Sequence, residues 1–400
     1  MNDTITGTIG LAVRRARRAR GLTLEQAAGR AGRSKAWLSN IENGKRSLDR
    51  RGDIAALAEA LEVSADTLIG EPAPEVQPGR HPWNLTSLRT ALLDASPGNP
   101  PDMPARPVPV LRELNNQADD ALRWSKWDTL LPLLPTLIGE LEVHAATSAG
   151  ADRDEALRLL VPATATTVIA LRYAGQPDLA WVAAERGCQA AALLGDPVQE
   201  AAAAYGAAHA RSSANRPRAL LTTPRTADAF EPLAASSLTA TEVYGMLRLS
   251  AALACAVQGD HAGAEEHGAE AARVAARLDD RPDAWELFGP SNAGVWRTSL
   301  AVEAGNAEKA LEYASQVEPR ALASGNRRAA LRMEKARAYA MLGGKDGDAI
   351  RELRAAERLS PAQVHGNPLI RELVGHLLHE ARREAGGRDL HGLAWRMGVV

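Results

Sequence analysis

The stretch that most restricts the fold of this chain is TLEQAAGRAGRSKAWLSNIENGKR, residues 23–46, whose spacing describes two short helices joined by a tight turn. Thr23 is followed three residues later by Gln26, which is the spacing of a capping box, so the first helix should begin at Leu24. We expect it to end near Gly32. Small residues share one face of this helix and let a second helix cross it closely. They are Ala27, Ala28 and Ala31.

The second helix of the pair has an apolar face and a polar face. Ser34 is a suitable N-cap, and Gly44 is a suitable C-terminal stop. Leu38 and Ile41 lie three residues apart and should face the core. The residues expected on the opposite, outward face are Lys35, Ala36, Ser39 and Asn40. This pattern predicts either an ordinary helical hairpin or a helix that enters a DNA major groove.

The charge of this region favours DNA. Residues 8–51 hold twelve Lys or Arg and three acidic residues, a net charge of +9, whereas the whole chain has a formal net charge of −2, so the other residues carry −11. A basic module attached to an acidic body suits contact with phosphates at one end of the molecule. The sequence therefore predicts DNA binding rather than an ordinary solvated helix surface.

Residues 8–70 resemble the helix-turn-helix of the XRE family, which includes the phage lambda and Cro repressors. The resemblance covers a preceding basic helix from Thr8 to Arg20 and implies a five-helix domain like that of lambda repressor. Two further helices complete it, one with Ile54, Leu57, Ala58 and Leu61, and one capped by Ser64 with Leu68 and Ile69. The loop RSLDRRGD after Lys45 departs from the family, because it lacks the usual proline and has Arg50 and Arg51 where apolar residues are usual.

The resemblance implies roles for individual residues. Lys35 could donate to guanine O6 or N7, and Asn40 could pair with adenine. The resemblance places Ser34, Lys35, Ala36 and Asn40 at base edges, and Asn43, Gly44, Lys45 and Arg46 at phosphates. Ser39 is also expected to contact DNA. Arg17 and Glu42 match a structural ion pair between the first and third helices. Trp37 either packs on the core or lies at the rim of the groove, and we favour packing.

Composition favours helices in the rest of the chain. Aromatic residues make up 4% of the 400 residues and Ala and Leu dominate the apolar set, whereas strands would need more Val, Ile, Tyr and Phe. The length allows two or three domains. Without a long apolar run or a signal-peptide pattern, we expect a cytoplasmic protein with no membrane partner. Cys188 and Cys255 have no CxxC partner and should be buried, reduced thiols.

A proline-rich segment separates two domains. EPAPEVQPGRHP (71–82) and SPGNPPDMPARPVP (96–109) should not be helical, because each proline removes a donor and restrains the residue before it. Between them, residues 83–93 form a short amphipathic piece that should dock on the body or on a dimer mate. Its apolar residues are Leu85, Leu88, Leu92 and Leu93. The expected domains are a DNA-binding domain at 1–71, a linker at 72–107 and a helical body at 108–400.

From about residue 108 the sequence repeats a helix, a turn and a second helix. The turns are marked by Gly175, Asn215, Gly259, Gly305 and Gly343, at steps of 40, 44, 46 and 38 residues. The known pattern that fits best is the tetratricopeptide repeat, which EAGNAEKALEYASQVEP and AMLGGKDGDAIRELRAAERLSP resemble. We predict an all-α chain whose body is an α-solenoid of stacked helical hairpins.

Stacked hairpins leave a concave surface, lined mainly by the first helix of each pair, that is a natural ligand site. Asn side chains can hold the backbone of a peptide there, and arginines can take a terminal carboxylate. The residues expected to bind a ligand are Tyr244, Arg248, Asn292, Trp296, Arg328 and Arg332. The alternative is that Tyr244 and Trp296 pack between repeats and the arginines are solvated.

Signatures of catalysis and of cofactors are weak. GGKDG lies in a turn between helices and lacks the spacing of a phosphate-binding loop. His365, His376 and His379 lie near one another, but no acid or cysteine completes a recognisable set of metal ligands. No serine or cysteine has a local nucleophile signature. We therefore expect no cofactor, no metal and no catalysis.

The two-part layout resembles that of the Gram-positive peptide-pheromone regulators, in which an XRE head is joined to a tetratricopeptide-type body. The resemblance implies quorum sensing by a homodimer whose heads bind half-sites of double-stranded operator DNA. The body would bind a signalling peptide or another small effector that alters DNA binding. The alternative is an interaction hub whose body recruits a protein partner to DNA without a small effector.

Overall fold

The computed structural model describes residues 9–69, 84–96, 98–214, 217–384 and 388–399, without the side chains of 211–221 and 381–384. In these ranges all regular structure is helical, apart from an isolated bridge between Ser96 and Asn99. The chain is all-α, as its composition predicts. Thr8, Asn215 and the linker segment 71–82 lie outside the described residues.

The head, residues 9–69, contains five helices: α1 (Ile9–Ala19), α2 (Leu24–Arg30), α3 (Lys35–Glu42), α4 (Arg51–Ala60) and α5 (Ala65–Ile69). The predicted capping box is confirmed. The Gln26 amide donates to the Thr23 hydroxyl at 3.2 Å, and the Thr23 amide donates to the Gln26 side chain at 2.9 Å. The Ser34 hydroxyl accepts from the Trp37 amide at 3.2 Å, so Ser34 caps α3. The apolar faces meet in one core, which includes Leu38, Ile41, Ile54, Leu57 and Leu68.

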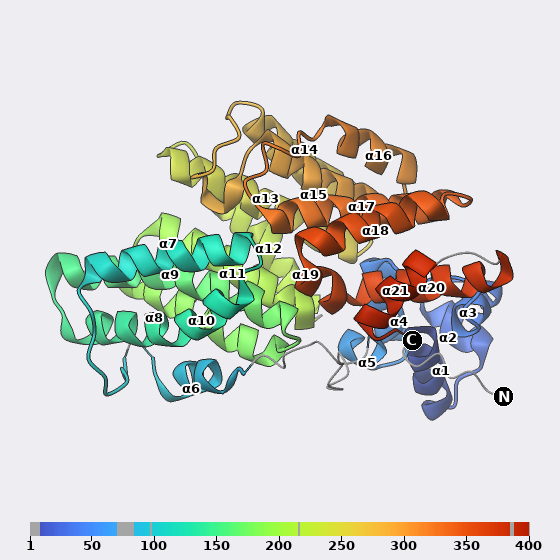
Figure 1. Ribbon diagram of the computed structural model, residues 1–400, viewed down its shortest axis with the longest axis horizontal. Coiled ribbons are helices and arrows are strands. Elements are labelled where there is room, and N and C mark those ends of the chain that lie inside the picture. Colours follow the sequence, from blue (N-terminus) through green and yellow to red (C-terminus); the bar gives the residue numbers. More distant parts are fainter. Residues whose placement is uncertain (1–8, 70–83, 97, 215–216, 385–387, 400) are drawn as a thin grey trace.

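The body, residues 108–399, consists mainly of helical hairpins that follow one another along the chain (Figure 1). The first helices of six hairpins are α7 (Val108–Arg123), α9 (Gly150–Tyr173), α11 (Pro197–Ala214), α13 (Leu238–Val257), α15 (Pro290–Glu303) and α17 (Gly325–Leu342). The second helices are α8 (Trp127–Thr147), α10 (Pro177–Leu194), α12 (Pro217–Phe230), α14 (His261–Ala275), α16 (Ala307–Gln316) and α18 (Asp346–Leu359). The remaining elements are the 3-10 turns η1 (Glu231–Leu233) and η2 (Trp285–Leu287) and the helices α19 (Pro361–Gly366), α20 (Pro368–Glu384) and α21 (Arg388–Met397).

Glycines mark the turns as predicted. Gly175, Gly259 and Gly305 follow the first helices of their hairpins with φ of 70°, 78° and 79°, a left-handed conformation that costs glycine little. The prediction that 96–109 contains no helix is wrong at its end, because α7 begins at Val108. Pro109 lies in the first turn of that helix, where a backbone N–H has no helical partner to lose.

The six first helices form a closed ring. Each of α7, α9, α11, α13 and α15 contacts the next first helix, and α17 returns to contact α7. At this closure the Ser324 hydroxyl donates to the carbonyl of Arg123 at 3.2 Å, and Asn326 donates to the carbonyl of Leu122. The concave surface expected of a solenoid is therefore the inner side of a ring.

The short helix α6 (Thr86–Asp94) packs against α8 and α10. Of the two docking partners considered for this amphipathic segment, the structure of the single chain shows the body. Leu88 and Leu92 are buried there, whereas Leu93 is exposed. One described helix, α13, is long and apolar enough to cross a membrane, but 89% of its most apolar window is buried in the fold, as expected for a core helix. Neither Cys188 nor Cys255 forms a disulfide, and burial raises the pKa of the Cys255 thiol to about 11.

Candidate nucleic-acid interface

The outward face of α3 is open to solvent. Ser34, Lys35, Ala36 and Asn40 are exposed, and Ser39 is half-buried, while Leu38 and Ile41 on the opposite face are buried. The arrangement follows from helical spacing, because the apolar residues three apart turn one side of α3 into the head. The residues that the sequence places at base edges thus share one solvent-facing surface.

An ion pair fixes α3 on α1. Arg17 donates to both oxygens of Glu42, at 2.6 and 2.8 Å, and its third contact is the carbonyl of Leu22 at 2.8 Å. Glu42 is buried, and its hydrogen bond raises the pKa of Arg17 above the ordinary value. A forked pair of this kind sets the orientation of α3 more firmly than a single contact would.

Trp37 packs on the head core as a partly buried residue. The guanidinium carbon of Arg33 lies 5.5 Å from the centre of its ring, a cation–π distance. The favoured reading of Trp37 as a packing residue agrees with this position.

Asn43 has a local role that the sequence did not indicate. Its side-chain amide donates to the carbonyl of Ser39 at 2.7 Å, and its side-chain oxygen accepts from Arg14. These contacts tie the end of α3 to α1. Asn43 is exposed, but part of its hydrogen-bonding capacity is already used within the head.

Three cations flank the outward face without a partner in the described part of the chain. Lys35, Lys45 and Arg46 are exposed, and none of them forms an ion pair or side-chain hydrogen bond there. The backbone amides of Lys45 and Arg46 donate to the carbonyl of Asn40, at 2.9 and 3.2 Å, which holds this turn against α3. Since exposed ammonium and guanidinium groups meet phosphates readily, these side chains can supply backbone contacts to DNA.

The head docks on the body through other surfaces. Gly52 and Ala55 of α4 approach α13, where a Cβ on Gly52 would lie 3.4 Å from the carbonyl oxygen of Ala256. Leu369 of α20 joins the head core, and Glu372 of the same helix accepts from the Ile9 amide at 3.0 Å. In Figure 1 the head lies at one end of the molecule, with α6 to α10 at the other. Docking by α4 and the start of α1 leaves the outward face of α3 uncovered.

Of the two arginines at the start of α4, Arg51 takes part in this docking. Arg50 pairs with Asp53 at 2.7 Å within the head. Arg51 binds Glu303 of α15, donating from its backbone amide at 2.8 Å and from its side chain. Glu303 also pairs with Arg337 of α17 at 2.9 Å. The sequence shows both arginines, but the partner of Arg51 lies 252 residues away in the chain.

Residues 8–68 match a family model described as a helix-turn-helix domain. The head is a helix-turn-helix domain. With the all-α fold, it indicates a DNA-binding regulator rather than an enzyme. Searches of curated proteins and of solved structures found no match.

The six residues expected to bind a ligand do not lie together. On α13, Tyr244 and Arg248 are buried, and Arg248 bonds to Tyr244 at 2.9 Å and to Glu231 of η1 at 2.6 Å. On α17, Arg332 pairs with Glu352 of α18 at 2.8 Å, and Arg328 donates to the carbonyl of Leu322 at 2.9 Å. These four side chains engage outer helices and loops, because the closed ring turns the other side of α13 and α17 inward.

Asn292 and Trp296 of α15 are the two members of the set that approach other side chains on the inner side of the ring. Trp296 is 8% exposed, and its ring centre lies 6.0 Å from that of His209 on α11. The side-chain amide of Asn292 donates to the carbonyl of Glu286 at 3.0 Å. Ligand binding by any of the six stays a prediction.

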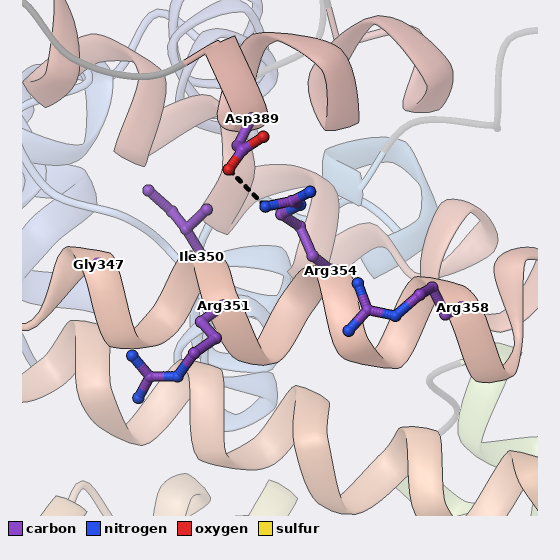
Figure 2. Close-up of a pocket in the computed structure, with 6 residues that line it drawn as sticks. All are labelled: Gly347, Ile350, Arg351, Arg354, Arg358 and Asp389. Carbon is purple, nitrogen blue, oxygen red and sulfur yellow. Dashed lines mark hydrogen bonds and ion pairs between the residues drawn. The ribbon is translucent and has the colours of Figure 1, made fainter.

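A second basic surface lies on α18. Arg351, Arg354 and Arg358 follow one another along this helix and line an open pocket of about 330 Å³ beside α21, where Arg354 pairs with Asp389 (Figure 2). Arg351 pairs with Asp348 at 2.6 Å, and Arg358 is exposed without a partner in the described residues. The histidines that lie near one another in the sequence, His365, His376 and His379, belong to no group of potential metal ligands among the described residues. His365 instead bonds to Glu357 at 2.8 Å.

Proposed function

We propose that this protein is a cytoplasmic transcription regulator that recognises a specific operator through the outward face of α3. What supports this most directly is that the exposed cations of α3 and of the turn after it have no intramolecular partner among the described residues. Isolated surface lysines can be merely solvated, but here they flank a capped, outward-facing helix in a helix-turn-helix domain.

The proposed division of labour separates bases from phosphates. Ser34, Lys35, Ala36 and Asn40, with Ser39 beside them, meet base edges, and Lys45 and Arg46 meet phosphates on either side. Asn43 contributes less than relatives of the XRE type would suggest, because its side chain is bonded to Ser39 and Arg14.

The regulator acts as a homodimer, and its body is the sensing part. A two-fold dimer would bind a palindrome whose half-sites are about one helical turn, roughly 34–36 Å, apart. The tetratricopeptide-like body binds a signalling peptide or another small effector, by analogy with the peptide-pheromone regulators. To act as a switch, that effector must bind two arrangements of the heads with unequal affinity.

DNA fragments selected from genomic DNA by the intact protein provide the operator for a mobility-shift test. Lys35→Ala should relax base preference and cost about 1–3 kcal/mol on the best site, whereas Lys45→Ala should weaken all sequences alike and lower the salt slope by about 1. Arg358→Ala, which removes an exposed cation from α18, is the matched control and should bind as the parent does. Unchanged binding by both head variants would remove the residue assignments.

The effector part is tested separately, by the melting temperature of the purified protein in a small-mass fraction of cell extract. A bound effector raises that temperature by an amount that grows with the logarithm of its concentration over its Kd. An interaction hub predicts no change with this fraction.

A further inference from the structure

The inner side of the ring carries aromatic and cationic side chains that DNA binding does not use. We define the inner cluster as Arg172 on α9, Tyr205 and His209 on α11, Trp285 on η2, Trp296 on α15 and Arg327 on α17. The first and last of these residues, Arg172 and Arg327, are 155 residues apart in the sequence. It is the folding of the chain into a ring that brings the cluster together.

The aromatic members form a continuous chain. Ring centres lie 4.4 Å apart for Tyr205 and His209, 5.1 Å for Tyr205 and Trp285, and 6.0 Å for His209 and Trp296, each pair edge to face. A flat aromatic guest packed against these rings would gain further ring contacts.

Arg172 is the exceptional cation of the cluster. Arg327 pairs with Glu286 at 3.2 Å, but Arg172 has no acidic partner within the described residues and donates instead to Nδ1 of His209 at 3.2 Å. Its Nε–H is shielded from water and unbonded, as is the Nε1–H of Trp296. Charges away from bulk water are normally paired, so a guanidinium with no acidic partner among the described residues indicates a place for an anion.

His209 adds no charge to this place. Burial lowers the pKa of His209 well below its ordinary value of 6.5, and the neighbouring charges of Arg172 and Arg327 act in the same direction. Its ring is therefore neutral at pH 7. The positive charge of Arg327 is neutralised by Glu286. The inner cluster therefore has one uncompensated positive charge, on Arg172, which suits a guest with one negative charge.

The members of the inner cluster differ in exposure. Arg172, His209, Trp285 and Arg327 are half-buried, whereas Tyr205 and Trp296 are buried. Closure of the ring by α7 and α17 limits how far a longer guest could extend.

The backbone beside the cluster is strained. Glu286 and Leu287 adopt left-handed conformations with φ of 50° and 57°, which non-glycine residues rarely take. Such conformations persist where surrounding structure enforces them, and they gather at ligand-binding and switch segments. In this segment Trp285 packs against Tyr205, and Glu286 pairs with Arg327.

We propose that the inner cluster binds a small acid that joins one carboxylate to a flat aromatic group, with Arg172 holding the carboxylate and the Tyr205, Trp285 and Trp296 rings packing around the aromatic part. This rests on the proposed function, because the acid is the effector of the sensing body. Arg172 can use its unbonded Nε–H for the carboxylate, and the Trp296 Nε1–H is a second donor. The same chemistry is offered by a free aromatic acid and by a peptide that ends in an aromatic residue.

The site can communicate with the head through charge. Burial lowers the pKa of Arg172, and repulsion by the positive charge of Arg51, which anchors the head to Glu303, acts in the same direction. An anion beside Arg172 offsets that repulsion and so favours the docked arrangement of the head. By linkage, any change that the acid makes in DNA affinity is matched by an equal change that DNA makes in affinity for the acid.

The test is thermal melting and calorimetric titration of the full chain with benzoate, salicylate and indole-3-acetate, each compared with its neutral carboxamide. At least one acid should raise the melting temperature, and its amide should not. Arg172→Gln should weaken that acid about tenfold or more, as expected for loss of a charge-assisted hydrogen bond. Arg172→Lys should fall between the two, and Arg358→Gln, at an exposed position of α18, should bind as the parent does.

A short acetylated peptide ending in tryptophan distinguishes the two sources of the carboxylate. Binding of the peptide but of none of the acids assigns the site to a peptide terminus. The proposal is overturned if amides stabilise as well as acids, if no acid and no peptide binds, or if a folded Arg172→Gln protein binds the acid unchanged. Mobility shifts measured without any acid test the head alone. A protein that binds an acid but no DNA would refute the proposed regulator function, while the proposed acid-binding site would stand.

Discussion

Glu303→Gln should loosen the docking of the head without disturbing DNA recognition. The side chain of Glu303 is 0% exposed and accepts from the Arg51 amide at 2.8 Å, from the Arg51 side chain and from Arg337 at 2.9 Å. Burial opposes ionisation of this carboxyl, but Arg337 and Arg51 prevail and hold the pKa of Glu303 below its ordinary value. It is therefore an anion that joins a head cation to a body cation.

The size of the loss in docking free energy depends on which partners Arg337 and Arg51 keep in Glu303→Gln. Arg337 is 1% exposed and keeps one acidic partner, Glu334 at 2.7 Å, while the partly exposed Arg51 can turn to water. Breaking a buried ion pair by removing one partner costs about 3–5 kcal/mol. Because each cation has some compensation, we expect the low end, about 3 kcal/mol, which raises the population of undocked heads about a hundredfold.

Hydrogen exchange of the native protein measures this opening directly, at the amides of residues 48–58. Glu352→Gln is the matched control, because Glu352 is also buried between two cations, Arg332 and Lys335, both at 2.8 Å, and both of these partners belong to the body rather than to the head. It should destabilise the α17–α18 hairpin and leave exchange in the head unchanged. The reasoning is refuted if both variants change exchange at residues 48–58 equally, or if Glu303→Gln leaves it unchanged.

Three further results are expected. Burial raises the pKa of Glu372 from 4.5 to about 7, so the folded chain keeps a proton that the unfolded chain releases. The resulting contribution to stability is full below about pH 4.5 and is lost as the pH rises to 7. Urea titrations of the parent at pH 4.5 and 8 should therefore differ by about 3 kcal/mol in the free energy of unfolding, and Glu372→Gln should remove this difference. Gly245→Ala should destabilise by about 1–3 kcal/mol in the same assay, since its Cβ would lie 1.9 Å from the Phe288 ring, and adding Phe288→Leu should recover part of the loss. Thr23→Ala should cost about 1 kcal/mol by removing the cap of α2.

Each of these three predictions would be contradicted by a particular result. A pH dependence that is identical in Glu372→Gln would mean that the carboxyl is ionised in the fold. A Gly245→Ala protein as stable as the parent would show that Phe288 moves without cost. An unchanged stability of Thr23→Ala would place the first turn of α2 under the control of packing alone.

The position of the head on the body has consequences for regulation. Docking uses α4, the loop before it and the start of α1, and therefore leaves α3 open in the arrangement described here. An effector would then act by changing how firmly two heads are held relative to each other, rather than by uncovering α3. The Arg51–Glu303–Arg337 contacts are the part of the molecule where such a change would be felt first.

What the sequence determined alone was local. The capping box at Thr23, the cap at Ser34 and the spacing of Leu38 and Ile41 each act within a few residues, so they define the helices of the head and the face of α3 that points outward. The turn glycines of the body are local signals of the same kind. Helix-forming composition, in turn, was enough for the all-α class.

What only the tertiary structure decided was which side of each body helix faces inward. Chain segments about 200 residues apart, at Arg123 and Ser324, meet to close the ring, and no local pattern encodes that closure. It turns Arg248 and Arg332 toward outer acids and brings Arg172, which had no distinguishing motif, beside His209. The same packing brings His209 near Trp296. The partner of Arg51 was hidden for the same reason, since a side chain finds its charge partner through packing rather than through neighbours in the sequence.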